Sequence, residues 1–205
     1  MNPYLALIIS ILTAYLMGSF PTSFIFVKIL KGIDIRQIGS KNAGATNVLR
    51  AVGKIPALIT LAVDILKGVL AVTVLVNFFY SIGVNLNYNF YRVLLGFCAI
   101  CGHIWPAFLK FKGGKGMATT LGVGGVIAPL ALVISLAIWL IVFVISNYVS
   151  LSSIIALIFF PIIVFLCNYS CYTRISSVAI SCLVIYKHKE NIRRLMRGEE
   201  NKVKI

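Results

Sequence analysis

The chain has 205 residues, of which 60% are hydrophobic and only 12% are charged, and its mean hydropathy is +1.00. A soluble domain of this length cannot bury so much apolar surface, and charged residues ordinarily make up about 25% of a globular protein, so the composition indicates an integral membrane protein. The 19 Lys and Arg residues against 5 Asp and Glu give a net charge of +14, which favours anionic lipid headgroups or a phosphorylated substrate as partners.

Five apolar segments are candidates to cross the membrane as helices, for which about 20 residues are ordinarily needed. In chain order they are Tyr4–Ile29, Ile55–Phe79, Tyr91–Phe108, Leu151–Cys167 and Ile175–Tyr186. The first segment has no basic start and no small-residue cleavage site. We therefore predict that it is a retained span rather than a removable signal.

A further apolar stretch, Met117–Ser146, is too long for one upright crossing, since 30 residues of helix extend about 45 Å. It contains three closely spaced glycines, Gly122, Gly124 and Gly125, and then Pro129. These residues predict a break that divides the stretch into two short helices of about 13 to 16 residues each. Helices of that length are short for a bilayer unless the membrane is locally thinned.

The basic residues are concentrated in three segments between the apolar ones, with six in 28–54, three in 110–115 and seven in 187–204. This placement argues against a nucleic-acid partner. Basic connections remain in the cytoplasm. Six spans would leave the basic tail outside, whereas dividing Met117–Ser146 gives seven spans with all three basic segments inside. We therefore predict one all-α membrane-embedded domain, 1–205, with seven transmembrane helices, the N-terminus outside and the C-terminus cytoplasmic.

The first basic segment contains a polar run, Gly39–Asn47, followed by Arg50. Glycines let backbone amides approach a ligand, and an arginine fork suits phosphate. A helix cap is the better explanation for Ser40 taken alone. The whole cluster favours anion binding, with Ser40, Asn42, Thr46 and Arg50 as candidate residues.

The second basic segment contains His103 and the run Gly113-Gly114-Lys115-Gly116. The run is not a Walker A motif, because the first glycine is absent and a glycine stands at the hydroxyl position. Lys115 at the start of a predicted helix still suits an anion. Lys112 fits an interfacial anchor as well as a substrate ligand, as does its neighbour Lys110. His103 fits a structural role, as a cap or at the interface, and a functional role equally well.

In the tail, His188 and Asn191 share a helix face because they are three residues apart. The tail's apolar residues recur at helical spacing, which predicts an amphipathic helix lying along the membrane. Inside the second span, Asp64 and Lys67 are also three apart. They fit a structural ion pair and a functional site equally well. Cys98-x-x-Cys101 has no second such pair, which favours ordinary helix residues.

The order and spacing of these motifs resemble the bacterial acyl-phosphate:glycerol-3-phosphate acyltransferases of the PlsY type, over nearly the whole chain. The three long matches are Gly39–Asn47 with Arg50, Gly102–Thr119, and His188, Asn191, Ile192, Arg194, Leu195, Gly198 and Glu200. Shorter matches are Gly18, Ser19 and Pro21, and Asp64, Lys67 and Gly68. Many such sequences carry Gly at the position of Lys41 and Pro at that of Ala43, so the first loop is expected to be more basic and less rigid here.

The resemblance implies an enzyme that transfers an acyl chain from acyl phosphate to the 1-hydroxyl of glycerol 3-phosphate, the first acylation of phospholipid synthesis. It implies a bacterial cytoplasmic (inner) membrane, an active site on the cytoplasmic face, and the acyl-phosphate-forming enzyme as a partner. The phosphate and glycerol contacts that it implies are Ser40, Arg50, Lys115, His188 and Asn191. Further substrate-binding candidates are Asn42, Thr46, His103, Lys112, Arg194 and Glu200.

Both substrates carry phosphate, which explains why basic residues come from three separate loops. An acyl phosphate is already activated, so no enzyme nucleophile is required, and the sequence contains no Gly-x-Ser-x-Gly elbow. A His-x-x-x-x-Asp pattern is also absent. We expect catalysis by positioning and charge neutralisation, without cofactor or metal. Either His188 or the phosphate of the donor fits the role of general base. A transporter or a lipid-binding structural protein are the competing hypotheses, but neither explains the ordered motifs.

Overall fold

The structure is a computed structural model that describes residues 1–203, so Lys204, counted above in the basic tail, lies outside the described residues. Residues 1–203 form helices and connecting turns without any β-strand, which confirms the predicted all-α class. The chain divides into two compact units, Met1–Val126 and Ile127–Ile205. Each unit is described by itself.

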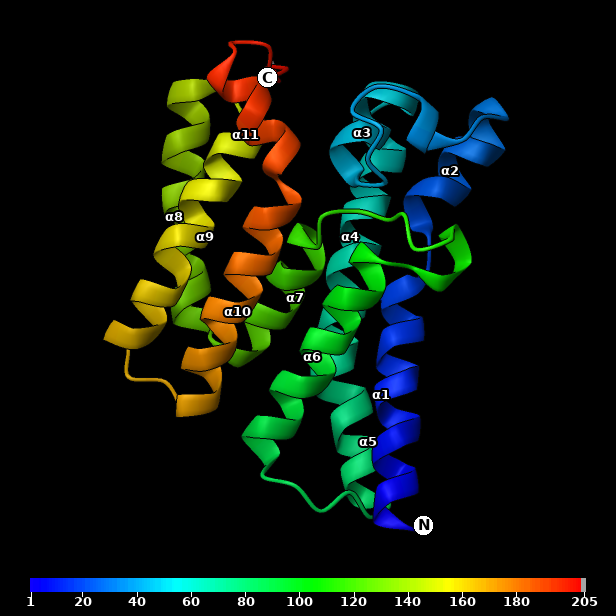
Figure 1. The fold of residues 1–205 in the computed structure, drawn as a ribbon, viewed down its shortest axis with the longest axis vertical. Coiled ribbons are helices and arrows are strands. Elements are labelled where there is room, and N and C mark those ends of the chain that lie inside the picture. Colours follow the sequence, from blue (N-terminus) through cyan, green and yellow to red (C-terminus); the bar gives the residue numbers. More distant parts are fainter. Residues whose placement is uncertain (204–205) are drawn as a thin grey trace. The chain divides into compact units, whose positions relative to one another are not determined.

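The first unit is built from seven helices, three of which are extended or followed by short turns (Figure 1). The helices are α1 (Pro3–Ser19), α2 (Thr22–Lys31), α3 (Ala45–Val52), α4 (Lys54–Leu70), α5 (Val76–Ser81), α6 (Tyr88–Ile104) and α7 (Met117–Ile127). The short turns are η1 (Ile35–Gln37), the π turn η2 (Ala71–Leu75) and η3 (Ala107–Leu109). Helix α1 packs along α6, and α3 packs against α4.

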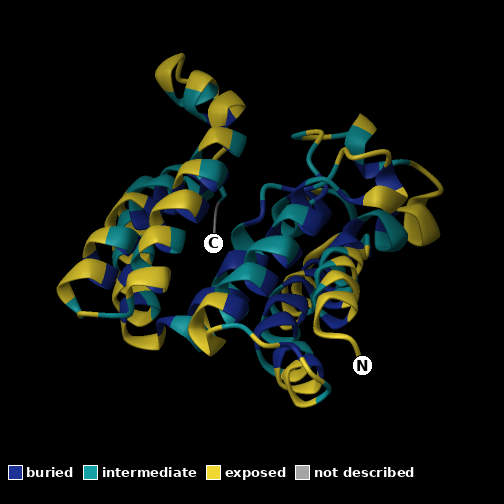
Figure 2. Ribbon diagram, turned by 60° about the horizontal axis from the view of Figure 1, so that its bottom comes forward, coloured by how far each residue is buried: buried dark blue, intermediate teal, exposed yellow. Residues whose placement is uncertain are grey.

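The second unit contains α8 (Pro129–Ser146), α9 (Val149–Leu166), α10 (Cys171–Lys187) and α11 (Lys189–Met196). Helix α9 packs against both α8 and α10. In both units the helices carry buried residues on some faces and exposed residues on others, as the dark blue and yellow segments of Figure 2 show. Many exposed residues are large and apolar, including Ile145 and Leu166 at more than three-quarters exposed, as expected of surfaces covered by lipid.

Within residues 1–203, five helical stretches are long and apolar enough to cross a membrane. They are Pro3–Lys31, Lys54–Ser81, Tyr88–Leu109, Pro129–Ser146 and Val149–Leu166. Helix α7 is apolar but has 11 residues, and α10 has 17. The prediction of an integral membrane protein is thus confirmed, while the count of seven spans and the sidedness of the termini stay predictions.

The predicted break in Met117–Ser146 is confirmed, because α7 ends at Ile127 and α8 begins at Pro129. The two helices have 11 and 18 residues and are less equal than expected. Pro129 stands at the first position of α8, where its missing N–H is not needed. Ala128, which precedes the proline, leaves the helical conformation with φ −141° and ψ 63°, as residues before proline tend to do.

Two other predicted spans depart from a regular α-helix. The segment Tyr4–Ile29 is two helices, because α1 ends at Ser19 and α2 begins only after Pro21. A proline cannot donate a backbone hydrogen bond, and it drives the residue before it out of the helical region. The segment Ile55–Phe79 continues without a break but widens into the π turn η2.

Glycines allow α4 and α7 to touch through their backbones. A Cβ atom added to Gly122 would meet the carbonyl group of Ile65, and one added to Gly68 would meet the carbonyl group of Thr119. Such close approach at small residues is the usual packing of helices in membranes. The motif glycine Gly68 therefore has a structural reason.

Within each unit, connections that are distant in sequence lie near the same ends of the helices. In the first unit, the N-terminus and the connection 82–87 lie at one end, and α3 with the connection 105–116 lies toward the other (Figure 1). In the second unit, the Val203 N–H donates to the carbonyl oxygen of Asn147 at 3.0 Å, so the tail lies beside the α8–α9 connection. The Leu130 N–H donates to the Tyr169 hydroxyl at 3.2 Å, which joins the start of α8 to the α9–α10 connection.

Candidate active site

The first polar loop is folded around one buried side chain, Asn47, which is 2% exposed. Its Nδ2 atom lies 3.1 Å from each of three carbonyl oxygens, those of Ile35, Ile38 and Asn42. Its Oδ1 atom accepts the Ser40 N–H at 3.1 Å. The polar groups of Asn47 are thus used to shape the loop, so this member of the polar run organises the candidate site.

The same loop contains two residues in the left-handed region, Gly39 with φ 55° and Lys41 with φ 56°. A Cβ atom at Gly39 would meet Oδ1 of Asn47, so glycine is needed there. Lys41 adopts a conformation that costs least for glycine. The hydrogen bonds made by Asn47 hold the loop in this shape despite the unfavourable backbone conformation of Lys41.

The predicted ligands of the first loop lie around this framework. Ser40, Asn42 and Thr46 are half-buried, and Arg50 is exposed in the last turn of α3. The N-cap of α3 is Gly44. The alternative in which Ser40 caps this helix is therefore wrong.

The second polar loop folds back on the end of α6. The Gly113 N–H donates to the carbonyl oxygen of Ile104 at 3.2 Å, and the Gly114 N–H donates to that of His103 at 3.1 Å. A Cβ atom at Gly114 would lie 3.0 Å from the carbonyl oxygen of Ala43. The loops that carry Ser40 and Lys115 are consequently in direct contact. Lys115 is half-buried and Lys112 is exposed.

Arg36, which the sequence analysis did not single out, joins the segment before the first polar loop to η3. The Arg36 guanidinium lies 2.6 Å from Asp34 and donates to the carbonyl oxygen of Leu109 at 2.7 Å. The hydrogen bond from Arg36 lowers the pKa of the Asp34 carboxyl group and keeps it charged. The spacing Asp-x-Arg beside the polar run was the available signal, but it gave no indication of the distant carbonyl group.

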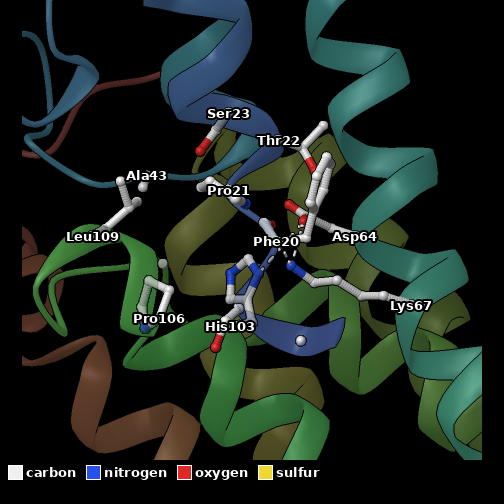
Figure 3. Close-up of a pocket in the computed structure, with 13 residues that line it drawn as sticks. Phe20, Pro21, Thr22, Ser23, Ala43, Asp64, Lys67, His103, Pro106 and Leu109 are labelled. Atoms are coloured by element: carbon white, nitrogen blue, oxygen red, sulfur yellow. Dashed lines mark hydrogen bonds and ion pairs between the residues drawn. The ribbon is translucent and has the colours of Figure 1, made fainter. Parts of the chain in front are cut away.

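Three buried polar side chains meet beneath these loops (Figure 3). Lys67 Nζ lies 2.8 Å from Asp64 Oδ1, and His103 Nδ1 lies 3.5 Å from the same oxygen. The two charges therefore form the ion pair that was one of the predicted alternatives. Lys67 Nζ is also 3.5 Å from the carbonyl oxygen of Phe20, which accepts the Thr22 N–H at 3.1 Å at the break between α1 and α2.

These side chains line a pocket formed by several of the motifs. It is lined by Gly18, Ser19, Phe20, Pro21, Thr22, Ser23, Ala43, Asp64, Lys67, His103, Pro106, Leu109 and Gly114. The short sequence matches at 18–21 and 64–68 thus meet the two polar loops at one place in the first unit. The Thr22 hydroxyl is buried at this pocket and has no hydrogen-bond partner within residues 1–203.

In the second unit, His188 is the residue between α10 and α11 and is 3% exposed. Its Nδ1 atom lies 2.8 Å from the carbonyl oxygen of Val184. A carbonyl can only accept, so this hydrogen bond requires the proton on Nδ1 and leaves the lone pair of the neutral ring on Nε2.

Glu200 is held by three side chains of the second unit. It accepts hydrogen bonds from Asn191 Nδ2 at 2.7 Å, Arg194 Nε at 2.7 Å and Ser150 Oγ at 2.8 Å. Burial would raise the pKa of Glu200, but these bonds and the Arg194 charge together lower it. A carboxylate used in this way orients Asn191 and repels phosphate, so Glu200 and Arg194 fit a supporting position.

The arrangement is that of a helical integral membrane protein whose short cationic loops are suited to phosphorylated molecules beside lipid. The family model described as glycerol-3-phosphate acyltransferase matches residues 8–198. The chain belongs to this family, in its PlsY type, and is a membrane enzyme of phospholipid synthesis. The resemblance inferred from the motifs is thereby confirmed.

Relatives in sequence and structure agree with this assignment. A glycerol-3-phosphate acyltransferase of Prochlorococcus marinus (strain MIT 9515) is 46% identical over 200 residues, covering 96% of each chain. One of Endomicrobium trichonymphae is 42% identical over 198 residues, covering 97% of this chain and 96% of that one. The crystal structure of PlsY (YgiH) in its glycerol 3-phosphate form is 36% identical, with a TM-score of 0.86 over 97% of this chain and 96% of that chain. A lysophosphatidic acid form of PlsY matches with a TM-score of 0.82 over 97% and 95%.

Proposed function

We propose that this chain transfers an acyl group from acyl phosphate to the 1-hydroxyl of glycerol 3-phosphate, giving 1-acyl-glycerol 3-phosphate and inorganic phosphate. The observation that carries the proposal is the contact between the two anion-binding loops at Ala43 and Gly114. It brings two cation-bearing motifs of the family together in one unit. The glycerol 3-phosphate and lysophosphatidic acid forms of the similar PlsY support the acceptor and the product.

In the proposed reaction, the 1-hydroxyl oxygen attacks the acyl carbon, and the bond from that carbon to the phosphate oxygen breaks. Phosphate leaves with the electron pair, and the hydroxyl proton passes either to a phosphate oxygen or to Nε2 of His188. Arg50 and Lys115 bind phosphate, and Ser40 donates to a phosphoryl oxygen. His188 and Asn191 orient the glycerol. Such positioning and charge neutralisation account for catalysis without an enzyme nucleophile.

The remaining candidates have secondary roles in this proposal. Asn42, Thr46 and Lys112 lie on the two loops and add donors or charge around the phosphates. Arg194 and Glu200 hold Asn191 in place through their hydrogen bonds.

We propose further that 1–205 acts as one domain in the bacterial cytoplasmic membrane, with seven crossings and the active site on the cytoplasmic face. In the first unit, the uncharged N-terminal end lies opposite the basic loops (Figure 1). In the second, the basic tail lies beside the α8–α9 connection. Both arrangements agree with seven crossings, since basic segments remain in the cytoplasm. The enzyme that forms acyl phosphate is the proposed metabolic partner.

The test is a donor competition with the purified full-length chain in detergent. Glycerol 3-phosphate is supplied with acyl phosphate, acyl-coenzyme A or an acyl carrier protein thioester, and lysophosphatidate and phosphate are measured. We expect product and equimolar phosphate from acyl phosphate alone, at a rate that thorough chelation of divalent cations leaves unchanged. Product from a thioester but not from acyl phosphate would overturn the proposed donor, and a loss restored by Mg²⁺ would overturn the metal-free mechanism.

A further inference from the structure

The ring of His103 lies between a buried ion pair and a glycine of the second polar loop. Its Nδ1 atom lies 3.5 Å from Asp64 Oδ1. On the other edge, a Cβ atom added to Gly114 would meet Nε2 and Cε1 of the ring. His103 is 8% exposed, and in Figure 3 its ring points toward the Asp64–Lys67 pair. The ring is thus confined on both sides.

The ion pair fixes the ring from the side of α4. Asp64 and Lys67 are 3% and 5% exposed, and their charged atoms are 2.8 Å apart. Charges buried to this degree persist only when they are paired and hydrogen-bonded. Because both residues belong to α4 and His103 belongs to α6, the cluster brings polar side chains of these two helices into contact.

The loop rests on His103 through its backbone as well. The Gly114 N–H donates to the His103 carbonyl oxygen at 3.1 Å, and Gly114 faces the carbonyl group of Ala43 from the first loop. Lys115 is the next residue. Any movement of the His103 ring toward Gly114 would therefore displace both the lysine and the contact between the loops.

We propose that His103 is a positioning residue: supported by Asp64 and Lys67, it sets the place of Gly114 and hence the phosphate-binding geometry of Lys115, without itself contacting substrate. This inference deepens the proposed function and rests on its assignment of Lys115 to phosphate. It gives the buried charges of α4 a role in substrate binding, because they support the ring on which Gly114 rests.

The test is suppression of one substitution by another, with the dissociation constant of glycerol 3-phosphate measured by calorimetry on the full-length chain in detergent. Gly114→Ala places a methyl group against the ring, and we expect it to weaken binding at least about tenfold, as a small misplacement of a binding group can. His103→Asn keeps an amide donor for Asp64 but lacks the Nε2 edge. In the double variant, we expect binding to recover at least about threefold relative to Gly114→Ala, since residues in contact are not additive.

Gly113→Ala is the matched control. Its added methyl group would meet the backbone carbonyl of His103 and the ring of Pro106, neither of which changes in His103→Asn. We therefore expect no recovery for His103→Asn combined with Gly113→Ala. Equal recovery at both glycines would overturn the proposal, as would independent losses that multiply in the Gly114 double variant or wild-type binding by Gly114→Ala.

A further variant separates positioning from folding. Asp64→Leu combined with Lys67→Met removes the charges together and leaves no unpaired ion, so the protein is expected to fold. The ring then loses its support, and we expect weaker glycerol 3-phosphate binding at an unchanged thermal midpoint; unchanged binding would overturn the role of the pair. Thr60→Val removes a buried hydroxyl that donates to the Pro56 carbonyl oxygen within α4, and it is the control for the loss of a buried polar group in the same helix. Because these measurements need no acyl donor, they are independent of the donor test above.

Discussion

Several polar side chains of the motifs bind the protein's own backbone rather than pointing outward. Asn47 holds the first loop through three carbonyl groups and one N–H, while Arg50 of the following helix is exposed. Asn47 thus has a structural task, whereas Arg50 is proposed to bind phosphate. The difference matters for mutagenesis, because we expect replacing Asn47 to unfold the loop and replacing Arg50 to weaken phosphate binding.

Arg50→Lys tests the bidentate phosphate contact, which a lysine cannot reproduce. Losing a charge-assisted hydrogen bond costs about 1.5–3 kcal/mol, so we expect kcat/KM for glycerol 3-phosphate to fall about ten- to a hundredfold while the protein still folds. Lys110→Ala, at an exposed position, is the control and should change kcat/KM less than about threefold. Both variants are measured in one detergent with saturating acyl phosphate. If Arg50→Lys keeps wild-type activity while Lys110→Ala is inactive, the phosphate site has been assigned to the wrong residues.

Glu200 predicts a pH dependence of stability. Its pKa is lowered in the folded chain by hydrogen bonds that outweigh its burial. A carboxyl group with a lowered folded pKa stabilises the protein above its unfolded pKa, and this stabilisation is lost as the pH falls through the folded pKa. Glu200→Gln should therefore lower the thermal midpoint at neutral pH by about 2–4 °C for each kcal/mol lost.

The same substitution should matter little at acid pH, where Glu200 is protonated in the wild type. The measurement is the difference between the two midpoints over a pH series, with Glu199→Gln at the exposed neighbouring position as control. A difference that stays constant down to acid pH would show that the charge of Glu200 is not what stabilises the second unit.

At the scale of helices, the interruptions explain which parts of the fold a sequence can reveal. Pro129 predicted the division of Met117–Ser146 because a proline after glycines is a strong local signal. Pro21 is the same signal in the first apolar segment, but the long apolar runs before Gly18 and after Ser23 masked it. The π turn η2 has no signal of its own, since no proline or glycine lies within Ala71–Leu75.

The packing of α4 on α7 gives a prediction for these helices. Gly122→Ala adds a methyl group where the carbonyl of Ile65 already lies, so the helices must separate. Overpacking of this kind costs about 1–3 kcal/mol. Gly125→Ala, at an exposed position of the same helix, should be neutral or stabilising by up to about 1 kcal/mol, because alanine is the better helix former.

Thermal unfolding in one detergent compares the two alanine variants. If Gly122→Ala and Gly125→Ala have the same thermal midpoint, the backbone contact between α4 and α7 does not limit stability.

At the scale of the whole chain, composition and motif order sufficed for the membrane class, the helical fold and the family. They also placed Ser40 and Lys115 on loops that the structure brings into contact. The sequence could not show that Glu200 binds Asn191 and Arg194, because a short motif does not say whether a polar residue points to a ligand or to its neighbour. It could not show the bond from Arg36 to Leu109 either, since residues 73 positions apart give no local pattern.

The last prediction concerns the path of the chain through the membrane. Helix α7 has 11 residues and extends only about 16 Å, which is less than the hydrocarbon thickness of about 30 Å. Whether α7 crosses the membrane therefore decides on which side every later connection lies. Seven crossings put the connection before α10 outside, and six put it inside.

Cys171 is a native exposed cysteine at the start of α10. With the other four cysteines replaced, Cys171 should react with an impermeant thiol reagent in intact cells. In the cysteine-free chain, Ser81→Cys should react likewise and Lys202→Cys should react only after permeabilisation. Labelling of the tail together with protection of Cys171 would mean that α7 and α8 make a single crossing, and the second unit would then face the opposite side of the membrane from the one proposed.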